Sequence, residues 1–207
     1  MSDSCEISEQ LIAACEIGDL PEVHRLVESG ADVECKTDMG ITPLLKAVFK
    51  GHVEVLRFLL SEGANVNHDG FVEQTALMNA SVRVDTALIN LLIDSGADVN
   101  LPLPRGGETA LHKAAVRGQT EAMRLLIERG GNVNLQSKSD APSEMNFFRT
   151  LWGETPLHIA AVFGDRAMIE IMLDAGADKT IETTNGRRPL SYAQENERPE
   201  EIVRLLK

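Results

Sequence analysis

Aromatic residues, clustered positive charge and long apolar runs are all scarce in this chain of 207 residues. Eight side chains are aromatic, about 4% of the total, so the core has to be built from Leu, Ile, Val and Ala. The formal net charge of -12 argues against a nucleic-acid partner, because phosphate binding requires clustered Lys and Arg. No apolar run approaches the ~20 residues of a membrane-spanning helix, so we also expect no membrane partner.

Cysteine and the motifs of enzyme chemistry are scarce as well. Cys5, Cys15 and Cys35 are odd in number and lie at one end, which indicates free thiols rather than a disulfide framework. The first residues lack the positive and apolar regions of a signal peptide, so we expect a cytoplasmic protein. The chain contains no nucleophile elbow, phosphate-binding glycine loop or metal-ligand spacing of His with Cys or carboxylates. We therefore expect no cofactor, no metal and no enzyme activity, although carboxylates are too plentiful for sequence alone to exclude a catalytic pair.

What the sequence does contain is a repeat with a period of 33 or 34 residues. A threonine-proline position recurs with steps of 33, 34, 46 and 33 residues, at Thr42, Thr75, Thr109, Thr155 and Arg188. A turn glycine recurs with steps of 33, 33, 34 and 46 residues, at Gly30, Gly63, Gly96, Gly130 and Gly176. Two independent markers that share one register, and one insertion, predict a stack of similar supersecondary units.

The segment from Gly153 to Gly164 carries the start and stop signals of one short helix. Thr155 can cap the helix, and Pro156 suits the first helical position because its missing amide would have no partner there. Gly164 is predicted to end the helix in the positive-φ conformation. Such a helix is too short to be stable alone, so it has to pack against its copies.

Three segments carry a resemblance to a known family: Gly40-Ile-Thr-Pro-Leu-Leu-Lys-Ala47, Gly107-Glu-Thr-Ala-Leu-His-Lys-Ala-Ala115 and Gly63-Ala-Asn-Val-Asn67. In them the chain resembles ankyrin-repeat proteins, over nearly its whole length. The resemblance implies an all-α solenoid of stacked helix-turn-helix units with hairpin fingers, whose fingers and inner helices line a concave binding face. It also implies that His112 and His158 tie inner helices to hairpins by structural hydrogen bonds.

We predict a single solenoid of six repeats, the first and last serving as caps. The repeats are assigned to residues 1–38, 39–71, 72–105, 106–136, 152–184 and 185–207, with a finger insertion at 137–151. In the third repeat Val84 replaces the loop glycine, which predicts a rebuilt or strained loop. Asn67, Asn100 and Asn134 recur at the fingers. We favour side chains that cap their own turns, although this position can be hydroxylated in eukaryotic ankyrin proteins.

The aromatic side chains suggest where a partner binds. Six of the eight fall either on positions that the resemblance places on the concave face or in the insertion. Exposed apolar residues gathered on one face indicate an interaction site, with Trp and Arg as common anchors. The predicted partner-binding residues are Met39, Phe49, Phe71, Val72, Arg83, Arg105, Arg117, Met145, Phe147, Phe148, Trp152 and Phe163. An alternative is that the insertion packs onto Val162 and Phe163 as a small satellite core.

The sequence therefore predicts a non-catalytic protein–protein interaction module, monomeric when unbound, that binds an unidentified protein through the concave face and the 137–152 finger. Two alternatives stay open: a stoichiometric regulator or inhibitor of a partner enzyme, and a secreted bacterial effector that acts on a host protein. Residues 1–38 carry ten carboxylates against Arg25 and Lys36, which indicates a solvated end or a docking surface for a basic partner.

Overall fold

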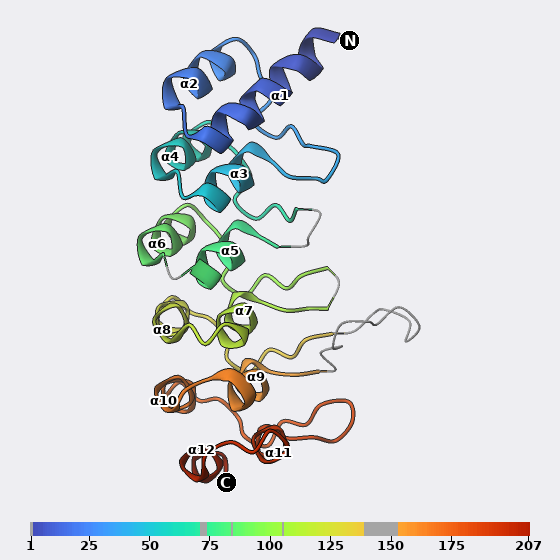
Figure 1. Cartoon of the computed structure of the whole chain (residues 1–207), viewed down its shortest axis with the longest axis vertical. Coiled ribbons are helices and arrows are strands. Elements are labelled where there is room, and N and C mark those ends of the chain that lie inside the picture. Colours follow the sequence, from blue (N-terminus) through green and yellow to red (C-terminus); the bar gives the residue numbers. More distant parts are fainter. Residues whose placement is uncertain (1, 71–73, 84, 105, 139–152) are drawn as a thin grey trace. The chain divides into compact units, whose positions relative to one another are not determined.

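The computed structural model describes residues 2–70, 74–83, 85–104, 106–138 and 153–207 (Figure 1). These residues form twelve α-helices and no strand, apart from an isolated bridge between Asp69 and Thr75. The prediction of an all-α fold is therefore confirmed. None of the helices in these ranges is long and apolar enough to cross a membrane.

Each repeat contributes an inner helix with an odd number and an outer helix with an even number. The helices are α1 (Ser2–Ile17), α2 (Leu20–Glu28), α3 (Pro43–Lys50), α4 (Val53–Ser61), α5 (Ala76–Arg83), α6 (Thr86–Asp94), α7 (Ala110–Val116), α8 (Thr120–Glu128), α9 (Pro156–Phe163), α10 (Arg166–Asp174), α11 (Pro189–Glu195) and α12 (Glu200–Leu206). The sequence predicts the first helix over Glu9–Ile17. In the structure α1 starts earlier, because residues 2–8 contain neither glycine nor proline to stop it.

The chain divides into two compact units, which are described separately. The first comprises Met1–Ala80 and Ala87–Ala97, and the second comprises Ser81–Thr86 and Asp98–Lys207. In the first unit α1 packs against α2 and α3, while the outer helices α2 and α4 contact each other. In the second unit the inner helices pack in the order α7, α9, α11, and the outer helices in the order α8, α10, α12.

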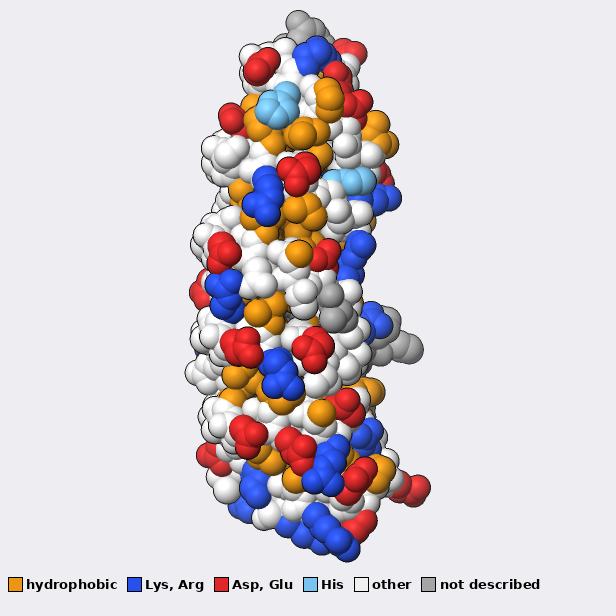
Figure 2. All heavy atoms as spheres, turned by 90° about the vertical axis from the view of Figure 1, so that its left-hand side faces the viewer, with side chains coloured by type: hydrophobic (Ala, Val, Ile, Leu, Met, Phe, Trp, Pro, Cys, Tyr) orange, Lys and Arg blue, Asp and Glu red, His pale blue; other side chains and the backbone are white. Residues whose placement is uncertain are grey.

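The core is aliphatic, as the scarcity of aromatics predicted. The helical spacing of Leu56, Leu59 and Leu60 predicts that all three are core residues. Leu56 and Leu59 on α4 are fully buried, but Leu60 is only half-buried. On the outer helices His24 stacks on Phe58 with ring centroids 3.7 Å apart. The face that carries the outer helices mixes apolar atoms with Lys, Arg, Asp and Glu (Figure 2), and its ion pairs, such as Arg166–Glu170 at 2.8 Å, are exposed.

Glycine follows the inner helices α3 and α9 in two different backbone conformations. Gly51 follows α3 with φ of 80°, in the left-handed conformation that the repeat pattern predicts. Gly164 follows α9 with φ of -73°, so the predicted positive φ is wrong there. A Cβ atom at Gly164 would lie 2.8 Å from the Ala160 carbonyl oxygen, so close backbone approach explains this glycine. The loop residue Val84 lies outside the described residues.

The finger asparagines connect neighbouring repeats instead of capping their own turns. The Asn134 side chain donates to the Gly176 carbonyl at 3.0 Å and accepts from the Asp178 amide at 2.8 Å. Asn100 donates in the same way to the Gly130 carbonyl at 3.0 Å. The turn itself is capped two residues earlier, since the Asn134 amide donates to the Asn132 side chain at 3.0 Å. The favoured prediction of own-turn capping by Asn100 and Asn134 is thus wrong.

His112 and His158 also connect neighbouring repeats. The Thr155 amide donates to Nδ1 of His158 at 3.1 Å, so Nδ1 is an acceptor and Nε2 carries the proton. Nε2 then donates to the Arg187 carbonyl at 3.0 Å, and His112 does the same to the Glu154 carbonyl at 3.1 Å. The structural role that the resemblance implied is confirmed. Burial disfavours the charged imidazole and lowers the pKa of both histidines to about 4. Both side chains are therefore neutral in the folded protein at neutral pH.

These histidines predict that the second unit loses stability in mild acid. In the unfolded chain each histidine is protonated as the pH falls through about 6.5, whereas in the folded protein each stays neutral until about pH 4. The free energy of unfolding should therefore fall as the pH drops from 6.5 to 4, by on the order of 3 kcal/mol for each histidine. Urea melts across this range, compared with His158→Leu, measure that loss. If the free energy of unfolding of the variant depended on pH as steeply as that of wild type, the assignment of a lowered pKa to His158 would be contradicted.

The hydrogen bonds of Asn134 predict that truncating this side chain to alanine lowers the stability of the protein. Asn134→Ala removes two hydrogen bonds between hairpins, so it should lower the free energy of unfolding by about 1–2 kcal/mol. Asn185→Ala, at an exposed hairpin tip, is the matched control and should change it by less than ~0.5 kcal/mol. Chemical denaturation of the three proteins makes the comparison, and equal stabilities would show that the contacts contribute nothing.

Candidate protein-binding site

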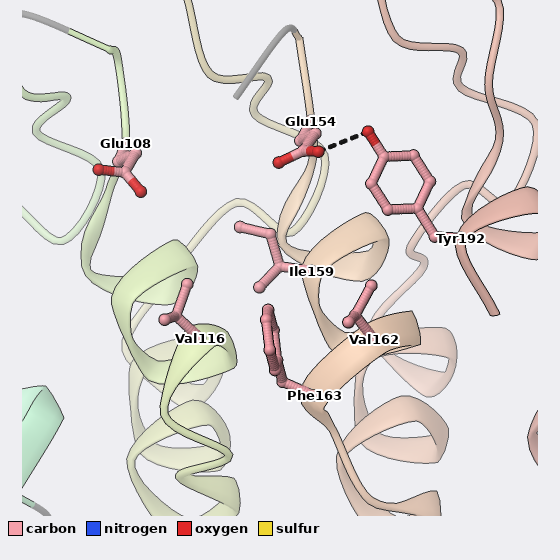
Figure 3. A pocket seen from close by; sticks show the side chains of 7 residues that line it. All are labelled: Glu108, Val116, Glu154, Ile159, Val162, Phe163 and Tyr192. Atoms are coloured by element: carbon pink, nitrogen blue, oxygen red, sulfur yellow. Dashed lines mark hydrogen bonds between the residues drawn. The ribbon is translucent and has the colours of Figure 1, made fainter. Parts of the chain in front are cut away.

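A pocket of about 210 Å³ lies in the second unit, on the inner-helix side (Figure 3). We call it the unit-2 pocket. Its described lining residues come from three consecutive repeats: Glu108, Val116, Glu154, Ile159, Val162, Phe163 and Tyr192. The two glutamates directly precede the helix-capping residues Thr109 and Thr155, so the caps of α7 and α9 fix where they lie.

One wall of the unit-2 pocket is apolar and open to solvent. Phe163, the last residue of α9, is 48% exposed, and Val116, the last residue of α7, is 37% exposed. Figure 3 shows Phe163 between Val116 and Val162, with Ile159 of the same helix above it, on the side of Glu154. Large apolar side chains that remain exposed together are typical of interaction surfaces.

The opposite wall is polar and held by internal contacts. Glu154 is 7% exposed, and the Tyr192 hydroxyl donates a hydrogen bond to its carboxylate (Figure 3). Burial raises the pKa of Tyr192, and the hydrogen bond to Glu154 raises it further, so the phenol stays a donor at neutral pH. Glu108 pairs with the Lys113 ammonium, both side chains being more than four-fifths buried.

Tyr192 itself is held in place from two sides. The Arg187 guanidinium lies over its ring, 4.3 Å from the centroid, and also pairs with Glu195. The His158 ring meets it edge-on at 5.3 Å. Because these contacts fix the tyrosine, the polar wall is already ordered before any partner binds.

The predicted site residues are spread over both units. Phe163 lines the unit-2 pocket, and Arg117 is exposed one residue after Val116. Arg83 is exposed at the end of α5, Met39 is 52% exposed in the first unit, and Phe49 on α3 is half-buried. Seven predicted residues lie outside the described residues: Phe71, Val72, Arg105, Met145, Phe147, Phe148 and Trp152.

Several pocket residues are absent from the predicted set. Glu108, Val116 and Glu154 occupy concave-face positions of the family pattern, but the prediction favoured aromatics and arginines. The sequence pattern places Tyr192 on an inner helix near the core. It is 8% exposed, yet it lines the pocket. In the first unit Ile17 is 72% exposed, immediately before the loop glycine as Phe163 is. It was missed because the first repeat lacks the threonine-proline segment that anchors the alignment.

The described part of the chain holds no group of three or more His, Cys, Asp or Glu residues that could bind a metal ion. The unit-2 pocket has apolar side chains on one side and the acidic groups of Glu108 and Glu154 on the other. Its geometry suits recognition of another molecule by shape, apolar contact and charge.

Comparison with known proteins identifies relatives of the repeats. The chain is 34% identical over 102 residues to the ankyrin repeat and KH domain-containing protein mask-1 of Caenorhabditis elegans. The aligned residues make up 49% of this chain and 4% of that protein. The chain spans between 2% and 22% of the length of the first curated relatives that it matches.

Two of the solved structures that match this chain cover almost all of it. One is the structure of a predatory endopeptidase from Bdellovibrio bacteriovorus in complex with its immunity protein. It matches with a TM-score of 0.78 and 26% identity over 96% of this chain and 97% of that one. The other is an ankyrin repeat domain from Acinetobacter baumannii, with a TM-score of 0.79 and 25% identity over 95% of both chains.

A family model described as ankyrin repeats matches three stretches, residues 11–102, 68–137 and 138–207, which together span nearly the whole sequence. The repeat period, the paired helices and these matches agree, and the chain belongs to the ankyrin-repeat family.

Proposed function

We propose that this chain is a non-catalytic protein-binding module whose partner covers the unit-2 pocket, with the 137–152 segment contributing to the same interface. Ankyrin repeats are protein-interaction modules, which supports the general class. The observation that carries the proposal is the exposure of Phe163 beside Val116, in a chain with only eight aromatic side chains. Burying them against a partner removes apolar surface from water, which favours association.

The order of the pocket walls supports a binding role. Tyr192 is fixed by Glu154, Arg187 and His158, so little side-chain freedom is lost there on association. Conformational ordering is one of the main costs of binding, and a preorganised surface reduces it. The unit-2 pocket is therefore the part of the described chain best suited to hold a partner.

Replacing Phe163 should separate binding from folding. Because this side chain is half exposed, Phe163→Ala should leave the melting temperature within about 3 °C of wild type. It should weaken partner binding by tenfold or more, as loss of a buried aromatic anchor does. A partner retained by wild-type bait is purified, and its affinity for both proteins is measured by calorimetry. Arg124→Ala, exposed on the outer helix α8, is the control and should bind as wild type.

The predicted finger residues need a separate variant. Phe147, Phe148 and Trp152, all outside the described residues, are replaced together by alanine. If the segment belongs to the interface, partner binding should be lost while the thermal melt stays close to wild type. A melting temperature far below wild type would instead favour the alternative in which this segment packs against its own repeat.

A second, narrower candidate is a stoichiometric inhibitor of a partner peptidase. It is supported by the similarity to the immunity-protein complex, whose matched chain corresponds to this one over almost its full length. Titration of a captured peptidase with this chain should reduce its activity to an endpoint near one molecule per enzyme. Full activity of a saturated complex would exclude inhibition and leave a binding role without it.

A further inference from the structure

The acidic groups of the unit-2 pocket already have partners inside the protein. Glu154 is buried, and its carboxylate accepts the Tyr192 hydroxyl. Glu108 pairs with the Lys113 ammonium, and both side chains are mostly buried. An occupant of the pocket therefore does not have to bring a hydrogen-bond donor or a cation to either carboxylate, and little would be gained by one.

The part of the pocket that stays open to solvent is the apolar wall. Phe163 and Val116 leave a large part of their side chains exposed, with Val162 and Ile159 beside them (Figure 3). The volume of about 210 Å³ is below the ~300–1,000 Å³ typical of small-molecule sites, which favours a single side chain as the occupant. A large apolar side chain removes this wall from water without burying an unpaired polar group of its own.

An exposed cation, Arg117, flanks the apolar wall. It directly follows Val116 in the chain. The next residue, Gly118, lies against the end of α9, because a Cβ atom there would be 3.5 Å from the Phe163 carbonyl oxygen. Both chain neighbours of Arg117 thus lie at the wall. Within the described ranges its side chain has no hydrogen bond or ion pair.

This cation sets the charge that a partner meets at the edge of the pocket. Lys113 and Arg187 are neutralised by Glu108 and Glu195, whereas Arg117 is not. A partner carboxylate would pair with Arg117, and a partner lysine or arginine would meet a like charge. Exposed ion pairs change affinity by up to about fivefold, so the charge selects among partners more than it holds them.

We propose that the partner inserts one large apolar side chain into the unit-2 pocket, against Phe163 and Val116, and places a neighbouring acidic residue of its own against Arg117. This inference rests on the proposed function, because it names the chemistry of the partner at the same site. The net charge of -12 opposes an acidic segment only weakly, because charges more than about 8–10 Å away are largely screened at physiological salt.

The test uses capped tripeptides as probes, added to protein labelled with ¹³C at its methyl groups. The Glu-Phe-Glu probe should bind with millimolar affinity, and its aromatic ring should shift the methyl signals of Val116, Ile159 and Val162. The Glu-Ala-Glu probe lacks the large apolar side chain and should bind at least tenfold more weakly. The Lys-Phe-Lys probe reverses the charge and should bind about three- to tenfold more weakly, since it loses an attraction and meets a repulsion.

Variants assign these effects to residues. Phe163→Ala should weaken the Glu-Phe-Glu probe at least tenfold. Arg117→Gln should abolish the preference for Glu-Phe-Glu over Lys-Phe-Lys. Arg124→Gln, the same substitution on the outer helix α8, is the matched control and should keep that preference. The neutral Gln-Phe-Gln probe should bind Arg117→Gln within about twofold of wild type, which shows that the fold and the apolar wall are intact.

Four results would overturn the inference: equal binding of Glu-Phe-Glu and Glu-Ala-Glu, a preference for Lys-Phe-Lys, shifts located on the outer helices, or no saturable shift up to ~50 mM probe. If the probe binds only after Phe147, Phe148 and Trp152 are replaced by alanine, the occupant is the 137–152 segment of this chain. If the pocket methyl signals shift on dilution of the protein alone, the occupant is a second copy.

Failure of this inference is distinct from failure of the proposed function. If a captured partner is lost by Phe163→Ala but held by Arg117→Gln as tightly as by wild type, the pocket binds a partner without using an acidic residue at Arg117. If the partner is held by Phe163→Ala, the proposed function itself is wrong.

Discussion

Contact between neighbouring repeats is the constraint on which this structure depends. The helices α2 to α12 are seven to nine residues long, and isolated helices of that length are marginal in water. Each is stabilised by burial of small and aliphatic side chains against the next helix. The histidines of α7 and α9 and the finger asparagines add directed hydrogen bonds, because each reaches a backbone carbonyl 29 to 42 residues further along the chain.

The same contacts assemble the candidate site. Val116, Phe163 and Tyr192 come from three consecutive repeats, so no single repeat could form the unit-2 pocket. Glu154 takes part both in the contacts between repeats and in the wall of the pocket. Its carbonyl accepts the His112 hydrogen bond that ties two repeats, while its carboxylate accepts the Tyr192 hydroxyl at the pocket wall. A surface held in this way can recognise a partner with little rearrangement of its own.

The fold was predictable from sequence because the repeat markers fix the register of the helices from α3 onward. Single positions were harder where tertiary contact overrides a local preference. Gly164 was assigned a left-handed backbone from its place in the repeat, but the adjacent Ala160 carbonyl is what requires glycine there. Asn134 looked like a turn cap, yet its partners Gly176 and Asp178 belong to the next repeat. The Tyr192–Glu154 pair is 38 residues apart in sequence, and no local pattern signals it.

The partner's footprint on the protein is the most direct test of the account. Methyl cross-saturation NMR, with a captured partner irradiated in the complex, reports which methyl groups lie against it. The account predicts loss of intensity at Val116 and Val162, beside the exposed Phe163 ring. Loss confined to outer-helix methyl groups such as those of Leu60 and Leu91, which line a groove between α4 and α6, would contradict it and move the binding surface to the outer helices.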